Sequence, residues 1–509
     1  MWNRLPRWLD NPILVKHARS RLRQIHLLPS IGIMAVISLA IVVGGYQWNG
    51  LQGSETFGML MILQSVMLGV MGASQVAASV GKARESGILD FHRVTPMSPF
   101  SLALGFFFGA PIREYLMFAV TLPFSMVCVF MGRPSPLGAI QLLFPLILGA
   151  WVMHAIALLN ALAGKSGKSN SGSRGVIGLV MFLVFGGSWF VPSFFSAATV
   201  VDEFPTGTVY GIRIPWLMIL PLDLLPVIGF FLVGATRKIA SERAHTLSKG
   251  QALGALTTAA VLIVGGLWDI EVHFIWTLVV LYGLVVGSIV LTSAITPNLD
   301  EFAKGIRKAA KEGRKYPSAW SDRGLNRIDV FCFGAVVLIA ATVCWRMIEK
   351  PVAWVPAGSI SYSLPIAIGV LVVAYNGLAL QYFLLRFGKR GPVVYALFLF
   401  TVWLLPPVCG AISAAARAQT RTPDTPADIW SPALASLSPV AGIVISSGIF
   451  SIPGIREAQA CALVPALVLA LLFNNLVTSI RRGVEKKIHP ADESRTSPDK
   501  PTELVPILA

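Results

Sequence analysis

The chain has 509 residues, of which 55% are hydrophobic and only 13% are charged. So much apolar sequence exceeds what the core of a water-soluble domain can bury, which excludes a soluble protein and indicates a polytopic membrane protein. The formal net charge of +16 does not indicate a nucleic-acid-binding domain, because the Lys and Arg residues lie between apolar stretches. Five cysteines are scattered without metal-ligand or disulfide spacing.

The N-terminal segment, residues 1–26, carries six basic side chains ahead of the first apolar stretch. It does not fit a secretory signal peptide, because no small-residue cleavage site follows closely. Asp10 or Asn11 can cap a helix with Pro12 in its first turn, and apolar residues alternate with basic ones after it. We expect an amphipathic interfacial helix on the cytoplasmic surface of the membrane.

Twelve apolar stretches follow, each long enough to cross about 30 Å of hydrocarbon. They lie at 27–46, 57–80, 101–131, 137–163, 175–200, 214–235, 251–268, 273–296, 329–348, 359–385, 392–412 and 457–480. Twelve crossings place both termini on one side of the membrane. The tails and the connections on that side hold 33 of the 41 Lys and Arg residues, which predicts that both termini are cytoplasmic.

The spans predict an all-α membrane protein built from two parallel six-helix halves, 27–235 and 251–480. In both halves a basic connection of 18 or more residues follows the second span, and a short basic connection follows the fourth. The linker between the halves is 236–250, and the tail, 481–509, has the composition of a disordered segment.

The second half contains two further segments of interest. The connection Asn298 to Arg327 is helical in pattern but much more charged than its counterpart in the first half. The stretch Ser431 to Phe450 is apolar but interrupted by Pro and Gly, so a re-entrant or interface-lying helix is expected there.

The connection Lys82 to Pro99, between the second and third spans, is short, charged and able to form a helix. Gly87 and Pro96 leave room for about two helical turns between them. At 100° per residue, Ile88, Phe91 and Val94 share one face of that helix. A helix this short is marginal alone in water, so we expect the membrane surface or another protein to hold it.

The sequence gives little support for chemistry in this chain. The fragment GKSGKS (164–169) lacks the first glycine of a phosphate loop, and LSKGQ (247–251) resembles an ATPase signature but has no soluble domain around it. The seven histidines are dispersed and the spans hold few acids, so neither a metal site nor acid–base catalysis is indicated. We expect no catalytic residue, metal or cofactor site.

A few polar side chains fall within the predicted spans and are candidates for a transport pathway, because ionisable groups in a membrane are costly. Arg113 and Glu114 are adjacent and can neutralise each other. His154 fits a hydrogen-bonded core histidine better than a ligand. Asp223 could line a polar cavity, or lie near the outer interface where flanking prolines distort its helix.

The N-terminal segment NPILVKHARSRLRQ and the connection KARESGILDFHRVTPMSPFSLALG together resemble the permeases of type-2 ATP-binding cassette (ABC) transporters. The residues that carry the resemblance in the N-terminal helix are Asn11, Pro12, Leu14, Lys16, Arg19 and Arg21. Those in the connection are Glu85, Gly87, Leu89, Asp90, Thr95, Pro96, Met97 and Ser98. Ile88 replaces the usual Thr, and His17 stands where an acid is common. The second half shares the topology but lacks this motif.

The resemblance implies a permease subunit in a bacterial inner membrane, an exporter and not itself an enzyme. It implies that an ABC ATPase subunit consumes the ATP and docks on a coupling helix in the connection, with membrane lipids and a second permease subunit as further candidate partners. The residues assigned to ATPase coupling are Arg84, Glu85, Gly87, Ile88, Leu89, Asp90, Phe91, Arg93, Val94, Thr95 and Pro96. Among them, Ile88, Leu89, Phe91 and Val94 are expected to seat in a groove of the ATPase.

Two other functions stay open. Twelve spans in two parallel halves are also the architecture of an ion-driven secondary transporter, although the basic loop usual after the second span of that group is missing here. A membrane-embedded enzyme acting on lipid-linked substrates is the third possibility, and it would need clustered acids, histidines or a metal site.

Overall fold

The structure is a computed structural model that describes most of the chain. The described residues are 11–48, 53–94, 96–131, 136–163, 206–242, 244–266, 274–314, 316–347, 363–419, 428–447 and 455–488. By their internal contacts the residues form two compact units. Unit 1 comprises Met1–Leu247 with Gly265–Ile270, and unit 2 comprises Ser248–Val264 with Glu271–Ala509.

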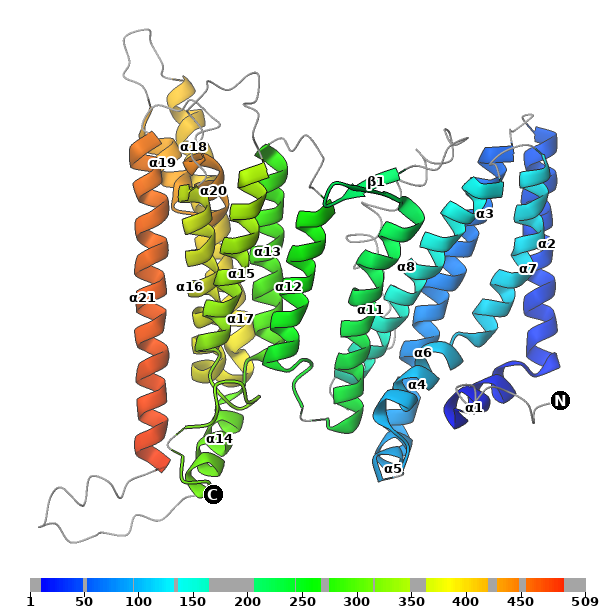
Figure 1. The fold of residues 1–509 in the computed structure, drawn as a ribbon, viewed down its shortest axis with the longest axis horizontal. Coiled ribbons are helices and arrows are strands. Elements are labelled where there is room, and N and C mark those ends of the chain that lie inside the picture. The colour runs from blue at the N-terminus through cyan, green and yellow to red at the C-terminus, as the bar shows by residue number, and fades with distance from the viewer. Residues whose placement is uncertain are drawn as a thin grey trace, which may run out of the picture. The chain divides into compact units, whose positions relative to one another are not determined.

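Unit 1 consists of helices and one small hairpin (Figure 1). Its helices are α1 (Pro12–Arg21), α2 (Gln24–Trp48), α3 (Gly53–Ser65), the π-helix η3 (Val66–Met71), α4 (Gly72–Glu85), α5 (Ile88–Val94), α6 (Pro99–Gly109), α7 (Ile112–Phe130), α8 (Pro136–Ala163) and α11 (Trp216–Ala240). Strands β1 (Thr206–Val209) and β2 (Ile212–Pro215) pair antiparallel, with Thr206 opposite Pro215. Helices α3, η3 and α4 follow one another without a break.

Unit 2 is helical throughout its described part (Figure 1). Its helices are α12 (Lys249–Gly266), α13 (Phe274–Ile295), α14 (Leu299–Lys311), α15 (Arg327–Met347), α16 (Ser363–Phe387), η5 (Gly388–Arg390), α17 (Gly391–Leu399), the π-helix η6 (Phe400–Leu404), α18 (Leu405–Gln419), α19 (Trp430–Ser436), α20 (Pro439–Ser446) and α21 (Ile455–Ile488). The last two residues of α12 belong to unit 1.

Nine helical stretches within the described residues are long and apolar enough to cross a membrane. They are Leu27–Gln47, Glu55–Glu85, Ile112–Phe130, Pro136–Ala163, Leu278–Ile295, Arg327–Arg346, Ser363–Phe387, Gly391–Gln419 and Ile455–Ile488. The described residues therefore agree with the expected mainly helical protein with several membrane spans, but they include one β-hairpin and nine candidate spans, not twelve. Helices α11 and α12 occupy the sixth and seventh predicted spans but are not among the nine, and the fifth prediction, 175–200, lies outside the described residues.

The third predicted span, 101–131, is not one helix. It is divided between α6 and α7 at Ala110 and Pro111. Proline has no backbone N–H to donate to the preceding turn and its ring crowds that turn, so Pro111 favours the start of a new helix over continuation of α6. Helix α6, with 11 residues, is too short to cross the membrane alone.

The stretch predicted to hold a re-entrant or interface-lying helix forms two short helices, α19 and α20. The turn between them ends at Ser438, whose hydroxyl accepts a hydrogen bond from the N–H of Val440. Proline at the first position of α20 has no N–H that needs a partner. Both helices pack on α21 in unit 2.

The LSKGQ fragment has a structural explanation. Ser248 and Gln251 form a capping box, in which each side chain binds the backbone N–H of the other, and α12 begins between them. Between these caps, Lys249 is buried beneath the loop that precedes α15. Its ammonium donates to the carbonyls of Ala319 and Leu325.

Candidate functional site

The predicted coupling segment forms α5, with the bounds expected from its flanking residues. Helix α4 ends at Glu85, and Gly87 follows with φ of +71°, a left-handed conformation that glycine adopts without strain. The N–H groups of Asp90 and Phe91 both donate to the Gly87 carbonyl at 3.1 Å, which starts the new helix. The chain thus turns sharply between α4 and α5.

The two sides of α5 have different environments. Leu89 is only 3% exposed and belongs to the core of unit 1, together with Ile13 of α1 and Ile239 of α11. Phe91 and Val94 point away from that core and are 64% and 82% exposed, while Ile88 is half-buried. The expectation that Leu89 seats in a partner's groove is therefore wrong for this structure, because its side chain already fills its own unit.

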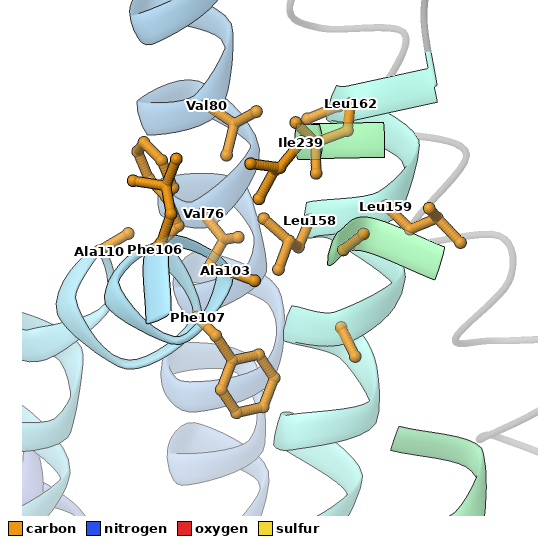
Figure 2. Packing of buried hydrophobic residues seen from close by; sticks show 14 of the residues in the cluster. Val76, Val80, Ala103, Phe106, Phe107, Ala110, Leu158, Leu159, Leu162 and Ile239 are labelled. Atoms are coloured by element: carbon orange, nitrogen blue, oxygen red, sulfur yellow. The ribbon is translucent and has the colours of Figure 1, made fainter. Parts of the chain in front are cut away.

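The core that receives Leu89 joins five other helices, α1, α4, α6, α8 and α11. Figure 2 shows Val76 and Val80 of α4, Phe106 and Phe107 of α6, Leu158 and Leu162 of α8, and Ile239 of α11 packed around a common centre. All of these side chains are less than 9% exposed. Helix α5 therefore rests on the part of unit 1 where these helices meet.

Two arginines tie α5 and the end of α4 to neighbouring helices. Arg84 donates to the carbonyl of Ala161 near the end of α8 at 2.9 Å and forms an ion pair with Glu242 at 2.8 Å. Arg93 donates to the carbonyls of Ile239 and Lys238 at the end of α11, at 2.9 and 3.2 Å. A guanidinium suits both places, because the final carbonyls of a helix lack helical partners and carry partial negative charge.

The remaining coupling candidates lie at the surface. Arg93 also pairs with Asp90, whose side chain is largely exposed. Glu85, Gly87 and Pro96 are exposed, and Thr95 lies outside the described residues. Burial lowers the pKa of His92, and the charge of Lys16 lowers it further, so the outer face of α5 gains no positive charge from this histidine at neutral pH.

Helix α1 is a capped helix, as the sequence predicts, with Asn11 as its N-cap. The Asn11 amide oxygen accepts from the N–H groups of Ile13 and Leu14, and its amide nitrogen donates to the carbonyl and hydroxyl of Ser101 in α6. Pro12 follows at the first helical position and is exposed. The cap therefore also fastens α1 to α6.

Glycines on α6 allow α1 to approach closely. A Cβ atom at Gly105 would lie 2.7 Å from the Cβ of Ile13, and one at Gly109 would lie 3.1 Å from the Cα of Leu14. The spacing of four residues places both glycines on one face of α6, the arrangement that lets two helix backbones come together. Only glycine fits at Gly105 without moving α1.

The basic residues of α1 have two different roles. Arg21 donates to Gln75 at 2.6 Å and to Ser79 at 2.9 Å, both on α4, whereas Lys16 and Arg19 are exposed. His17 lies edge-on to Phe106, and burial, aided by the charges of Arg21 and Lys16, lowers its pKa to about 4. Helix α1 is thus fixed to unit 1 by its polar side chains as well as by its apolar ones.

The structure pairs two of the four polar candidates within the spans and places a third, His154, against the residue that follows them, Tyr115. Glu114 is fully buried and pairs with Arg113 at 3.0 Å, and the adjacent Tyr115 hydroxyl contacts the Nδ1 atom of His154 at 3.2 Å. His154 is also fully buried, as expected of a core histidine. Asp223 stands apart, with an exposed side chain on α11.

Helix α14, in the connection that the sequence predicts as the counterpart of the coupling segment, has a different surface. Its apolar residues Phe302, Ile306 and Ala309 are buried, and the first two pack with Leu385 of α16 and the end of α21. Its outer face carries the exposed Lys304, Arg307, Lys308 and Lys311. Helix α14 therefore has no exposed apolar pair like that of α5.

Two features of the structure, one beside the site and one in unit 2, were not foreseen from the sequence. One is the π-helix η3, in the helix that leads to α5, and the other is the buried pair of Lys249 with Asp329 in unit 2. Local sequence carries no signal for either, since both depend on residues distant in the chain. Within the residues that the structure describes, no group of three or more His, Cys, Asp or Glu side chains could hold a metal ion.

Comparison of the chain with protein-family models, with curated proteins and with solved structures finds no match.

Proposed function

We propose that this chain is the membrane-spanning permease subunit of an ABC-type exporter, driven by a separate ATPase subunit that docks on α5. The observation that carries the proposal is the division of α5 into an anchored side and a free side. Leu89 holds the helix to unit 1, while Phe91 and Val94 remain exposed on its outer face. Exposed apolar side chains on a fixed helix, flanked by charges, are suited to docking in a groove of a soluble partner.

The connections of α5 make it suitable for receiving motion. It follows α4 directly in the chain, Arg84 ties the end of α4 to α8, and Arg93 ties α5 to α11. A displacement of α5 by a partner would therefore reach three helices at once, in the manner of the helix shifts that operate other switches. This chain would supply the pathway through the bacterial inner membrane, with cytoplasmic termini, and the partner would bind and hydrolyse ATP.

The proposal is tested by recovering the partner. The full chain, carrying an affinity tag, is purified from membranes of its own host in mild detergent, and the co-purified proteins are identified by mass spectrometry. We expect a subunit with a phosphate-binding loop and ATP hydrolysis in the complex. Serine in place of both Phe91 and Val94 should reduce recovery of that subunit about 30-fold or more, since truncating a docking anchor costs about 2 kcal/mol or more.

Phe130 provides a matched control. Its side chain is as exposed as that of Val94, at 82%. It lies at the far end of α7, 18 residues from Ile112, the first residue of that helix, and not on α5. Phe130→Ser should leave recovery of the ATPase subunit unchanged. Equal recovery with and without the α5 substitutions, or the absence of any ATPase subunit from the wild-type complex, would refute the proposal.

A further inference from the structure

The helix that leads to α5 contains a π-helical segment, η3, between α3 and α4. In an α-helix the N–H of Gly72 would donate to the carbonyl of Leu68. Here it donates to the carbonyls of Met67 and Gly69 instead. A π-helix takes up one more residue than the α-helix in the same stretch, and such segments occur often at functional sites.

A histidine from another helix binds the Leu68 carbonyl, which the N–H of Gly72 would bind in an α-helix. The Nε2 atom of His154, in α8, lies 2.9 Å from the Leu68 oxygen. A carbonyl can only accept, so Nε2 carries the proton and Nδ1 accepts from the hydroxyl of Tyr115. The imidazole is fully buried, and both of its nitrogens have a partner.

Gly72 is required for this contact. A Cβ atom at position 72 would collide with Nε2 of His154. The π-helix, the glycine and the histidine therefore form one matched arrangement, in which the histidine holds a carbonyl that a regular helix would use for itself.

Unit 2 also contains a π-helix with a side chain bound to one of its carbonyls, but the contact has a different origin. Its π-helix η6 includes Trp403, whose carbonyl accepts a hydrogen bond of 2.6 Å from the hydroxyl of Ser438, at the start of α20. The N–H of Leu405 donates to the Phe400 carbonyl, so the carbonyl that η6 frees is that of Thr401 and not that of Trp403. The Trp403 carbonyl lacks a helical donor because the residue four places later is Pro407, which has no N–H. Ser438 therefore offers a comparison for His154 and not a second case of it.

We propose that His154 is a positioning residue that sets the rotation of α4, and with it the direction of α5. Conversion of η3 to regular α-helix would turn the residues after it by about 100° relative to those before it, and advance them by about 1.5 Å. With His154 bound to Leu68 the π form persists. When that bond opens, α4 turns, and α5 turns with it.

The link to transport rests on the proposed function, because a docked ATPase would be the source of the force on α5. The contact between His154 and the π-helix η3 needs no partner protein, so it is tested on the full chain alone. A failure of this test leaves the ATPase recovery experiment unaffected, and a failure of that experiment leaves this one unaffected.

To measure the rotation of α4, Lys82 and Arg23 are each replaced by cysteine and spin-labelled. Both positions are exposed, Lys82 on α4 and Arg23 just before α2, and the five native cysteines are first replaced by serine. The distance distribution is measured by pulsed electron paramagnetic resonance in lipid nanodiscs without ATPase. We expect one distance in the wild type. His154→Leu should add a second, displaced by up to about 8 Å, the movement of a side-chain tip on a helix turned by 100°.

Three further variants make the test specific. Gly72→Ala should produce the same second distance, because its methyl group displaces the imidazole without removing it. His154→Gln should restore the single distance, since its amide nitrogen can donate to the Leu68 carbonyl. Ser438→Ala, in unit 2, should have no effect on this pair of labels.

The distance distributions decide the outcome. A single unchanged distance in both His154→Leu and Gly72→Ala overturns the proposal. If His154→Leu does not fold, Gly72→Ala alone decides. A second distance that His154→Gln fails to remove would also contradict the role of the hydrogen bond.

Discussion

The Nζ atom of Lys249 lies 2.9 Å from Oδ2 of Asp329, and the two side chains are 0% and 2% exposed. Together with the carbonyls of Ala319 and Leu325, the carboxylate surrounds the ammonium with acceptors. Burial lowers the pKa of Lys249, and the charge of Asp329 opposes that shift. The pair joins the beginning of α12 to the beginning of α15 in unit 2.

Removing one partner of this pair should be costly. Asp329→Ala leaves a buried ammonium without its counter-ion, and we expect a loss of about 3–5 kcal/mol in the free energy of unfolding, seen as a lower melting temperature in detergent. The double variant Lys249→Met with Asp329→Leu should recover much of that loss. Lys308→Ala, which removes a surface pair with Glu312, is the control and should change stability by less than about 1 kcal/mol. A double variant no more stable than Asp329→Ala would contradict this explanation.

Gly105→Leu should detach α1 from α6. The added side chain would occupy the space of Ile13 and the Asn11 amide, so α1 must move away. We expect faster tryptic cleavage after Arg19, Arg21 and Arg23 in the folded protein, measured by mass spectrometry. Gly81→Leu is the control, because a Cβ at Gly81 would meet nothing within 4 Å. Equal cleavage rates in the two variants would show that the glycine does not control the approach.

The docking of α1 should weaken in acid because of His17. Its pKa is about 4 in the folded protein, below the usual 6.5, so an undocked or unfolded α1 binds a proton at a higher pH than the docked form does. The contribution of His17 to the docking of α1 is therefore fully present above about pH 6.5, and it falls as the pH drops toward 4. The protection factors of the amides in residues 12–21, which correct the exchange rates for the slower intrinsic exchange in acid, should fall over that range. His17→Gln should remove the contribution of His17, and an identical pH dependence in that variant would disprove its role.

Arg93→Ala should loosen α5. It removes the hydrogen bonds to the carbonyls of Ile239 and Lys238 and the pair with Asp90, leaving Leu89 as the main anchor. We expect exchange of the amides of residues 88–94 to rise about 10-fold, equivalent to about 1.4 kcal/mol, which is close to the lower end of the range of about 1.5–3 kcal/mol for hydrogen bonds to charged groups. The exposed Glu85 serves for comparison, and Glu85→Ala should leave that exchange unchanged. Unaltered exchange in Arg93→Ala would mean that Leu89 alone holds the helix.

The sequence predicted well what depends on neighbouring residues. Gly87 and Pro96 defined the bounds of α5, and Asn11 and Pro12 indicated the start of α1. The helical period placed Ile88, Phe91 and Val94 on one face, of which Phe91 and Val94 are exposed in the structure. Hydropathy also predicted the position of each of the nine described helical stretches that are long and apolar enough to cross a membrane.

What the sequence could not supply depends on residues far apart in the chain. The burial of Leu89 requires Ile239, 150 residues later, and the π-helix η3 is bound by His154 from a different helix. The break at Pro111 was missed because the sequence on both sides is equally apolar. The spacing of Gly105 and Gly109 is one signal that could have been used, since small residues four apart often mark a close helix contact.

The short length of α5 has a practical consequence for engineering. Seven residues do not form a stable helix on their own, so the shape of this segment comes from Leu89 and Arg93 and the surfaces they touch. A synthetic peptide of the segment would be a poor decoy for a partner. A chimaera that transplants it into another scaffold would need the receiving ends of α8 and α11 as well.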